Sequence, residues 1–323
     1  MSGLDVRSVT VNYGATVAVQ DATFSVERGH VLALLGASGS GKSSLLRAIV
    51  GLEPMTAGSV HWEGQDLAGV KVHKRRFGLV FQDGQLFPTM SVAKNVAYGL
   101  SALDKLARRG RVAELLELVG LPGYGDRKPD ELSGGEAQRV ALARSLAPNP
   151  RAIFLDEPLS ALDAGLRQRL ADDLARILRE TDTTAVYVTH DQQEAFAVAD
   201  SVAVMKGGRI LQREVPDELW TRPTNKQVAA FLGFRTFITE ATAHQLGWDG
   251  RLEAGQVLGV GPRSLDLDDR GVSVPVLEQS MTVDHYVIRV RLPDGQEATV
   301  AAPTRTDAEH VRVRLTSGAI TPA

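Results

Sequence analysis

Short apolar runs separated by turn residues make up the N-terminal part of the chain. Residues 4–14, "LDVRSVTVNYG", and residues 17–30 alternate between apolar and polar side chains, which predicts half-buried strands. Residues 30–35, "HVLALL", form a continuous apolar run before a glycine, which is typical of a strand buried on both faces. Residues 42–52, "KSSLLRAIVGL", have helical spacing and predict a helix that ends at Gly51.

The middle of the chain changes to helical patterns and then returns to buried strands. Helical spacing dominates from residue 91 to residue 148. Residues 151–158, "RAIFLDEP", and residues 183–191, "TTAVYVTHD", are short apolar runs on either side of the amphipathic segment 166–180. Because strands alternate with helices, this part predicts a parallel sheet in an α/β domain.

The C-terminal part has a different texture. Residues 202–214 predict a hairpin with a Gly-Gly turn, and short helical patterns follow it. Residues 287–304, "VIRVRLPDGQEATVAAPT", alternate with period two around an Asp-Gly turn, so the tail predicts a small β-barrel or sandwich. We therefore predict an α/β domain over residues 1–235 and a β-rich domain over residues 240–323.

Composition narrows the class of protein. The 323 residues are 43% hydrophobic and 23% charged, which is typical of a soluble globular protein. The net charge of −3 carries no electrostatic footprint for nucleic acid, so no nucleic-acid partner is expected. The chain has no cysteine, which excludes a disulfide framework, a thiol nucleophile and a thiolate metal site. No apolar run approaches the roughly 18 residues of a membrane span, so work at a membrane would need separate membrane subunits.

The glycine-rich stretch "GASGSGKSS" follows the first buried strand and precedes the first helix. Its spacing Gly-x-x-x-x-Gly-Lys-Ser in this context predicts a P-loop, in which backbone N–H groups and the helix N-terminus hold phosphate. The lysine would reach the β- and γ-phosphates and the following serine would ligate Mg²⁺. A merely flexible loop is the alternative. The residues predicted to hold the nucleotide are Gly36, Ala37, Ser38, Gly39, Ser40, Gly41, Lys42, Ser43 and Ser44.

Two acidic residues follow the buried run of residues 151–158. Asp156 and Glu157 fall at the C-terminal end of a predicted strand, where open α/β sheets bind their ligands. We predict that Asp156 holds the Mg²⁺ shell and that Glu157, which points differently, polarises an attacking water. A strand end with an ordinary salt bridge is the alternative.

A second glycine-rich stretch distinguishes this chain from adenylate-type kinases and small GTPases. In "LSGGEAQR", residues Ser133, Gly134 and Gly135 open a predicted helix, which makes a second phosphate-binding helix N-terminus. Two copies arranged head to tail would build each phosphate site from one P-loop and one such stretch.

These motifs, in this order over residues 1–233, resemble the nucleotide-binding subunit of an ABC transporter. The resemblance implies ATP and Mg²⁺ as cofactors. It implies that Tyr13 stacks on the adenine and that Gln82 of "VFQD" touches Mg²⁺ or water and senses the membrane subunit. His190 would be the switch histidine beside the γ-phosphate, and the "SALD" stretch ending at Asp163 would be the D-loop at the dimer interface.

The resemblance also implies a fold and a reaction cycle. The fold would be a P-loop ABC ATPase domain, with a mixed sheet core, a β-subdomain and a helical subdomain, followed by an OB-like domain. Ser133, Gly134 and Gly135 would bind the γ-phosphate held by the opposite protomer of a homodimer. Mg-ATP would close the two subunits, and Glu157, His190 and Gln82 would serve hydrolysis. The catalytic contribution would be positioning and electrostatic stabilisation.

The stretch of residues 81–100, "FQDGQLFPTMSVAKNVAYGL", resembles subunits of importers for iron(III), thiamine, polyamines, sulfate or maltose-type sugars. Integral-membrane permease subunits and, indirectly, an extracytoplasmic solute-binding protein would be partners. The chain would then lie on the cytoplasmic face of the membrane. We favour iron(III) or thiamine as the solute, with sulfate, polyamine or sugar as alternatives. An exporter ATPase and a non-transport ABC protein are more distant alternatives.

Two positions depart from the usual pattern of these importers. Glu136 stands where glutamine is common, and Ser44 stands where threonine is common. Neither change removes an essential donor, so an active ATPase is expected. The β-rich tail resembles the OB-like regulatory domain of the same importers, and it would either bind a regulator or stabilise the dimer.

Overall fold

The computed structural model describes residues 2–82, 84–160, 162–283 and 285–323. The chain divides into two compact units, Met1–Pro216 and Asp217–Ala323. This division falls before α8 (Lys226–Phe231), whereas the sequence placed the change of texture after it. Part of the reason is that α8 packs against a strand of the second unit. The functional boundary near residue 235 stays a prediction.

A six-stranded sheet forms the centre of the first unit, with the strand order β10-β9-β3-β8-β7-β6. The pairs from β9 to β6 are all parallel, and β10 joins β9 in the antiparallel hairpin that the Gly-Gly turn predicted. The prediction of a parallel α/β sheet is therefore confirmed. The strands are β3 (Val31–Leu35), β6 (Phe77–Val80), β7 (Ala152–Asp156), β8 (Thr184–Thr189), β9 (Ser201–Lys206) and β10 (Arg209–Glu214).

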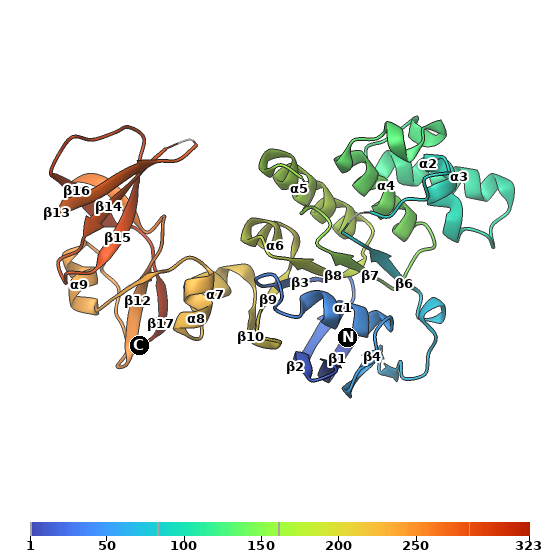
Figure 1. The fold of residues 1–323 in the computed structure, drawn as a ribbon, viewed down its shortest axis with the longest axis horizontal. Helices are drawn as coiled ribbons and strands as arrows, with labels where there is room; N and C mark the ends of the chain where they lie inside the picture. The colour runs from blue at the N-terminus through green and yellow to red at the C-terminus, as the bar shows by residue number, and fades with distance from the viewer. Residues whose placement is uncertain (1, 83, 161, 284) are drawn as a thin grey trace. The chain divides into compact units, whose positions relative to one another are not determined.

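Helices cover both faces of this sheet (Figure 1). Ile153 and Leu155 pack among side chains of α4 and α5, whereas Phe154 points to the opposite face and packs with α1. Because both faces of β7 are covered, successive side chains of this strand are apolar. The helices are α1 (Lys42–Val50), α2 (Val92–Val96), α3 (Lys105–Leu118), α4 (Gly134–Leu146), α5 (Ala164–Glu180) and α6 (Gln192–Val198). Short 3₁₀ turns are η1 (Val72–Lys74), η2 (Ala97–Gly99), η3 (Tyr124–Asp126) and η4 (Pro129–Glu131).

A four-stranded antiparallel sheet covers the outer side of α1, with the order β2-β1-β4-β5. Its buried side chains and those of the central sheet enclose α1 in one apolar cluster. A helix held from two sides keeps its N-terminus in a defined place, and that N-terminus follows the glycine-rich loop. The strands are β1 (Ser2–Tyr13), β2 (Thr16–Glu27), β4 (Ala57–Trp62) and β5 (Gln65–Asp66).

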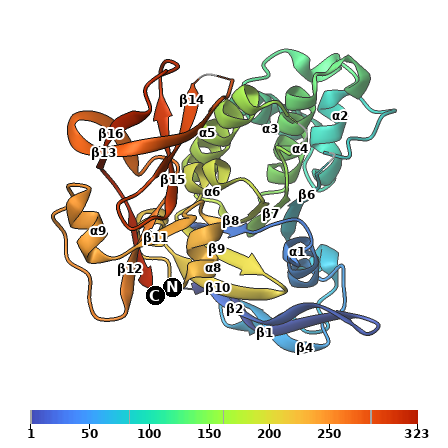
Figure 2. The same ribbon diagram turned by 60° about the vertical axis from the view of Figure 1, so that its left-hand side comes forward.

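The second unit is mainly an antiparallel β-domain, as the alternating tail predicted (Figure 2). Its sheets have the orders β11-β12-β17 and β15-β14-β13-β16. The long strand β13 pairs with β16 along its first part and with β14 along its second part, which gives a curled sheet consistent with an OB-like fold. The elements are α7 (Pro216–Thr221), α8, β11 (Thr236–Ile238), α9 (Glu240–Gln245), β12 (Gln256–Val260), β13 (Leu265–Met281), β14 (Tyr286–Arg291), β15 (Glu297–Ala302), β16 (His310–Leu315) and β17 (Ala319–Pro322).

Within the described ranges of both units, no helix has the length and apolar composition that crossing a membrane requires.

Candidate functional site

The glycine-rich loop runs directly from the buried strand β3 into α1. A Cβ atom on Gly36 would overlap the carbonyl oxygen of Met205, so only glycine fits there. Gly41 caps α1 with a φ of 98°, and a Cβ atom there would overlap the carbonyl oxygen of Ala18. The backbone therefore curls tightly against β9 of the central sheet and β2 of the four-stranded sheet before the helix begins, which is the shape that an anion-binding loop needs.

Lys42, the first residue of α1, folds its side chain back over this loop. Its Nζ donates hydrogen bonds to the carbonyl oxygens of Gly36 at 2.8 Å and Ala37 at 3.0 Å. It also lies 3.7 Å from Oε1 of Glu157. Burial lowers the pKa of the Lys42 ammonium, and the charge of Glu157 opposes this shift. A phosphate on this loop would meet a cation that is already largely stripped of water.

Ser43 and Asp156 meet although they are far apart in sequence. The Ser43 hydroxyl donates to Oδ1 of Asp156 at 2.6 Å, and Arg47, one turn along α1, lies 3.7 Å from the other carboxylate oxygen. A hydroxyl and a carboxylate are the hard oxygen donors that Mg²⁺ prefers, with phosphate and water completing its shell. These two side chains therefore fit a magnesium ion. The described residues contain no cluster of three or more His, Cys, Asp or Glu that would hold a metal without such help.

Glu157 turns away from its neighbour Asp156. Its φ is 47°, a left-handed conformation that is uncommon outside glycine, and its N–H donates to the Val188 carbonyl oxygen at 3.0 Å. Its Oε2 lies 3.1 Å from Nδ1 of His190. Because an ionised carboxylate only accepts hydrogen bonds, Nδ1 is the donor and Nε2 of the ring is left for another partner. The carboxylate thus lies between Lys42 and His190.

Tyr13 is the last residue of β1, lies beside the first turn of α1 and is 48% exposed. Its hydroxyl lies 3.2 Å from Oγ of Ser44 and donates to the carboxylate of Glu53. Glu53 also pairs with Arg47 at 3.6 Å. Burial raises the pKa of Glu53, and the charge of Asp156 raises it further. The exposed ring beside the glycine-rich loop is available to a flat ligand.

Gln82 follows strand β6, whose parallel neighbour β7 carries Asp156 at its end. Its side chain is exposed, and none of the described contacts joins it to Ser43 or Asp156. The next residue, Asp83, lies outside the described residues. The following segment is held by Arg144 of α4, which donates to the carbonyl oxygens of Gly84 at 2.9 Å and Gln85 at 2.8 Å. The structure places Gln82 at the edge of the sheet that carries Asp156, without a described contact to Ser43 or Asp156, and its predicted role stays a prediction.

Ser133 caps the N-terminus of α4, and Glu136 completes the cap. Oε2 of Glu136 accepts the Ser133 N–H at 2.7 Å, Oγ of Ser133 accepts the Glu136 N–H at 3.4 Å, and the Tyr124 hydroxyl donates to Glu136 at 2.8 Å. The Ser133 N–H and then the Tyr124 hydroxyl lower the pKa of Glu136 to about 2. The spacing Ser-x-x-Glu is a capping-box signal, so sequence reasoning overlooked the structural part of Glu136.

The signature stretch Ser133–Gly135 lies beside the beginning of α5. A Cβ atom on Gly134 would lie 3.4 Å from Cδ2 of Leu162. Asp163 caps α5, with its Oδ1 accepting the N–H of Leu166 at 3.0 Å. The predicted D-loop, residues 160–163, includes Ala161, which lies outside the described residues. Among the described contacts, none joins the signature stretch or Asp163 to the glycine-rich loop, so one chain presents two separate groups.

Three charged residues near these groups were missed by sequence reasoning: Arg47, Glu53 and Arg167. The position of Arg47 could have been predicted, because Arg47 is four residues after Ser43 and therefore lies on the same face of α1. The contacts of Glu53 with Tyr13 and of Arg167 with Asp191 could not have been predicted from the sequence, because the partners are distant along the chain.

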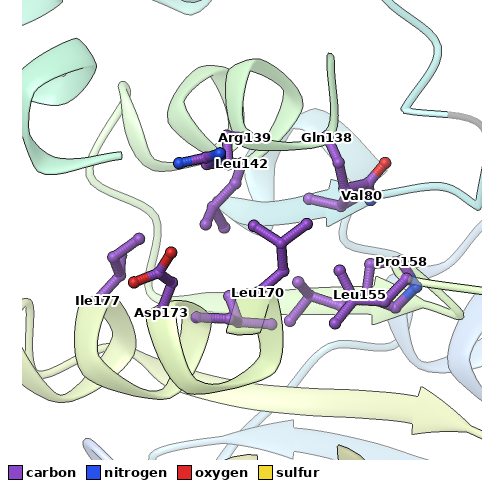
Figure 3. Close-up of a pocket in the computed structure, with 11 residues that line it drawn as sticks. Val80, Gln138, Arg139, Leu142, Leu155, Pro158, Leu170, Asp173 and Ile177 are labelled. Carbon is purple, nitrogen blue, oxygen red and sulfur yellow. The ribbon is translucent and has the colours of Figure 1, made fainter. Parts of the chain in front are cut away.

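A separate small cavity of about 30 Å³ lies between α4 and α5 (Figure 3). Its walls are mainly apolar, with Leu142, Leu155 and Leu170 among them, and Arg139 and Asp173 at its margin. None of the residues that were predicted to bind nucleotide lines this cavity. We therefore do not identify it with the candidate site.

The fold and the glycine-rich loop define a P-loop protein of the α/β class. The profile of the ABC transporter family matches residues 19–160. The iron(III) import ATP-binding protein of Streptomyces coelicolor is 45% identical over 283 residues, which cover 86% of this chain and 81% of that protein. The chain therefore belongs to the family of ATP-binding proteins of ABC transporters.

Other relatives and structures agree with this family. The iron(III) import ATP-binding protein of Haemophilus influenzae is 37% identical over 320 residues, covering 96% of this chain and 89% of that protein. A sulfate/thiosulfate import ATP-binding protein of Chromobacterium violaceum is 46% identical over 231 residues, covering 71% and 63%. A solved subunit of a Clostridium perfringens ABC transporter has a TM-score of 0.63 at 30% identity, covering 68% of this chain and 90% of that one. A dimeric ATP-binding cassette with ADP and phosphate has a TM-score of 0.59 at 30% identity, and the match covers 66% of this chain and 98% of that one.

Proposed function

We propose that this chain is the ATP-hydrolysing subunit of an iron(III) importer. The observation that carries the proposal is the contact group of Lys42, Ser43, Asp156, Glu157 and His190 at one edge of the central sheet. These side chains supply a buried cation, a pair of oxygen donors for a metal, and a carboxylate next to an imidazole. Phosphoryl transfer to water needs these parts, because its catalysis is positioning and charge stabilisation.

The proposed roles follow from the atoms that are free to act. The loop of residues 36–41 and the Lys42 ammonium bind the phosphates. Ser43 and Asp156 hold Mg²⁺, which neutralises the charge of the phosphates when it is bound. Glu157 accepts a proton from, or orients, the attacking water, and His190, which Glu157 holds through Nδ1, stands beside the γ-phosphate. Tyr13 stacks on the adenine, a contact worth about 1–3 kcal/mol for an aromatic side chain on a base.

We propose that the complete site forms between two copies arranged head to tail. Its support is that Ser133, Gly134 and Gly135 lie apart from the glycine-rich loop of the same chain, yet open a helix whose N-terminus suits phosphate. A related cassette was solved as a dimer with ADP and phosphate. Asp163, beside the signature stretch, would then lie at the interface, and Gln82 would adjoin the metal once the site closes.

Iron(III) is proposed as the solute because two relatives that align over more than nine tenths of this chain are iron(III) import ATP-binding proteins. The Haemophilus influenzae protein matches 96% of this chain, including the second unit, whereas the sulfate/thiosulfate relative matches 71%. Sulfate is the second candidate, since its relatives are as similar within the first unit. The importer assignment implies permease subunits that hold this chain at the cytoplasmic face of the membrane, and a solute-binding protein outside. Uptake of radiolabelled iron(III) into vesicles that carry the whole transporter, with sulfate as competitor, distinguishes the two solutes.

Replacement of the proposed base tests the chemistry. Glu157→Gln keeps the shape of the side chain but not its negative charge, so ATP binding should persist while hydrolysis slows at least about tenfold. The ATP-bound variant should elute as a dimer in size-exclusion chromatography. Glu180→Gln, an exposed change on α5, is the matched control and should retain wild-type turnover. Near-normal hydrolysis by Glu157→Gln would remove Glu157 from this role.

A further inference from the structure

Arg167, near the start of α5, contacts two loops that flank the candidate site. Its NH2 group donates to the carbonyl oxygen of Leu162 at 2.8 Å, in the D-loop of residues 160–163. Its NH1 group donates to Oδ2 of Asp191, the residue that follows His190, at 3.2 Å. Its Nε lies 3.6 Å from Oε1 of Glu194. A single guanidinium therefore joins the D-loop to the histidine loop, which we define as residues 189–191.

The histidine loop is tied to the same group of side chains. Glu194 is buried, and its Oε2 accepts hydrogen bonds from the hydroxyls of Tyr187 and Thr189, both at 2.7 Å. Thr189 Oγ in turn accepts the N–H of Asp191 at 3.0 Å, and Asp191 caps α6. His190 thus stands between two residues whose side chains both belong to this network. The network therefore holds the chain on both sides of His190 and links it to Arg167.

The other end of the connection reaches the signature stretch. Leu162, whose carbonyl oxygen binds Arg167, has its side chain against Gly134. A displacement of the α4 N-terminus would press on Leu162 and so on the guanidinium. Continuous contacts therefore run from Gly134 through Leu162, Arg167 and Asp191 to His190.

We propose that Arg167 is a positioning residue that keeps His190 aligned with Glu157 in response to the D-loop. This inference rests on the proposed function of ATP hydrolysis. The planar guanidinium suits the task because its donors are rigidly arranged and can address two or three acceptors together, which a lysine ammonium does with less geometric control. Without the guanidinium, the carboxylates of Asp191 and Glu194 would repel each other beside His190, and the histidine loop would shift from its position.

Steady-state hydrolysis by full-length variants tests the proposal. Arg167→Met keeps the side-chain stem and removes the donors; we expect kcat per ATP-binding site to fall about tenfold while KM for ATP stays within about threefold. Arg167→Lys should recover part of this loss. Arg176→Met is the matched control, because Arg176 lies on the same helix and forms its ion pairs, among the described residues, with the exposed carboxylates of Asp173 and Glu180. A merely structural part for Arg167 would lower the number of ATP-binding sites but not kcat per site, and that result would overturn the proposal.

A double-mutant cycle adds a second readout. Asp191→Asn removes the charge that Arg167 contacts but keeps a residue able to cap α6. If Arg167 acts through Asp191, the double variant with Arg167→Met should be no slower than the slower single variant. Multiplicative losses of kcat would contradict the proposed route. Lack of hydrolysis by the wild-type protein would overturn the proposed function and this inference together, whereas wild-type hydrolysis with an unaffected Arg167→Met would overturn this inference alone.

Discussion

Asn95 of α2 is fully buried and organises the loop that follows Gln82. Its Oδ1 accepts the N–H of Phe87 at 2.8 Å. Its Nδ2 donates to the carbonyl oxygens of Phe87, Met90 and Ser91 at 3.1, 3.2 and 3.2 Å. A single amide therefore holds both ends of residues 87–91 against α2, within the stretch of residues 81–100 that resembles importer subunits. We predict that Asn95→Ala destabilises the first unit.

The magnitude follows from the groups that lose their partners. Each neutral hydrogen bond contributes about 1 kcal/mol net, and a buried donor or acceptor left without a partner costs about 1–3 kcal/mol. Asn95→Ala leaves the Phe87 N–H unpaired and removes a donor from three carbonyl oxygens, so we expect the free energy of unfolding to fall by about 3 kcal/mol. Asn95→Asp should cost at least as much, because it places a carboxylate against those carbonyl oxygens.

Urea unfolding followed by far-ultraviolet circular dichroism measures this change. Lys94→Ala is the control, since Lys94 is the exposed neighbour on the same helix and its loss should leave the unfolding midpoint nearly unchanged. A difference below about 1 kcal/mol between Asn95→Ala and Lys94→Ala would refute the reasoning, because it would mean that water satisfies the exposed groups as well as the amide does.

Two further predictions concern the loop and the signature helix. Gly41→Ala should sharply weaken ATP binding, measured by titration calorimetry, because the added Cβ atom would overlap the Ala18 carbonyl oxygen. Gly39 also has a positive φ, but the space beside it is open. Gly39→Ala should therefore reduce the binding free energy only by its backbone strain, about 1–3 kcal/mol. Equal losses for the two variants would contradict this. Glu136 has a folded pKa lowered to about 2, so its stabilisation is present above its ordinary pKa of 4.5 and is lost as the pH falls towards 2. The urea midpoint of Glu136→Gln should therefore lie below that of the wild type at pH 7 and approach it in acid; a constant difference would argue against the cap.

Sequence reasoning located the elements whose causes are local. The glycine spacing of residues 36–41 required left-handed backbone and close packing, and α1 begins after Gly41 and ends before Gly51 as predicted. The Gly-Gly and Asp-Gly turns produced the expected hairpins, because each turn type depends on residues that are adjacent in the chain. The point at which the chain divides into two units is harder to predict from the sequence, because α8 packs against β17 of the second unit and no local sequence pattern indicates that contact.

By itself, the sequence determined the strand, loop and helix that make a phosphate-binding loop, and the order of the motifs around it. Only the tertiary structure decided which distant side chains meet. Parallel strands end at one edge of the central sheet, so Asp156 reaches Ser43, and the left-handed turn at Glu157 brings its carboxylate to His190. Arg167 acquires its partners in the same way, from loops that the sheet order brings together. Backbone conformation is specified over a few residues, whereas contacts between segments depend on how the whole core packs.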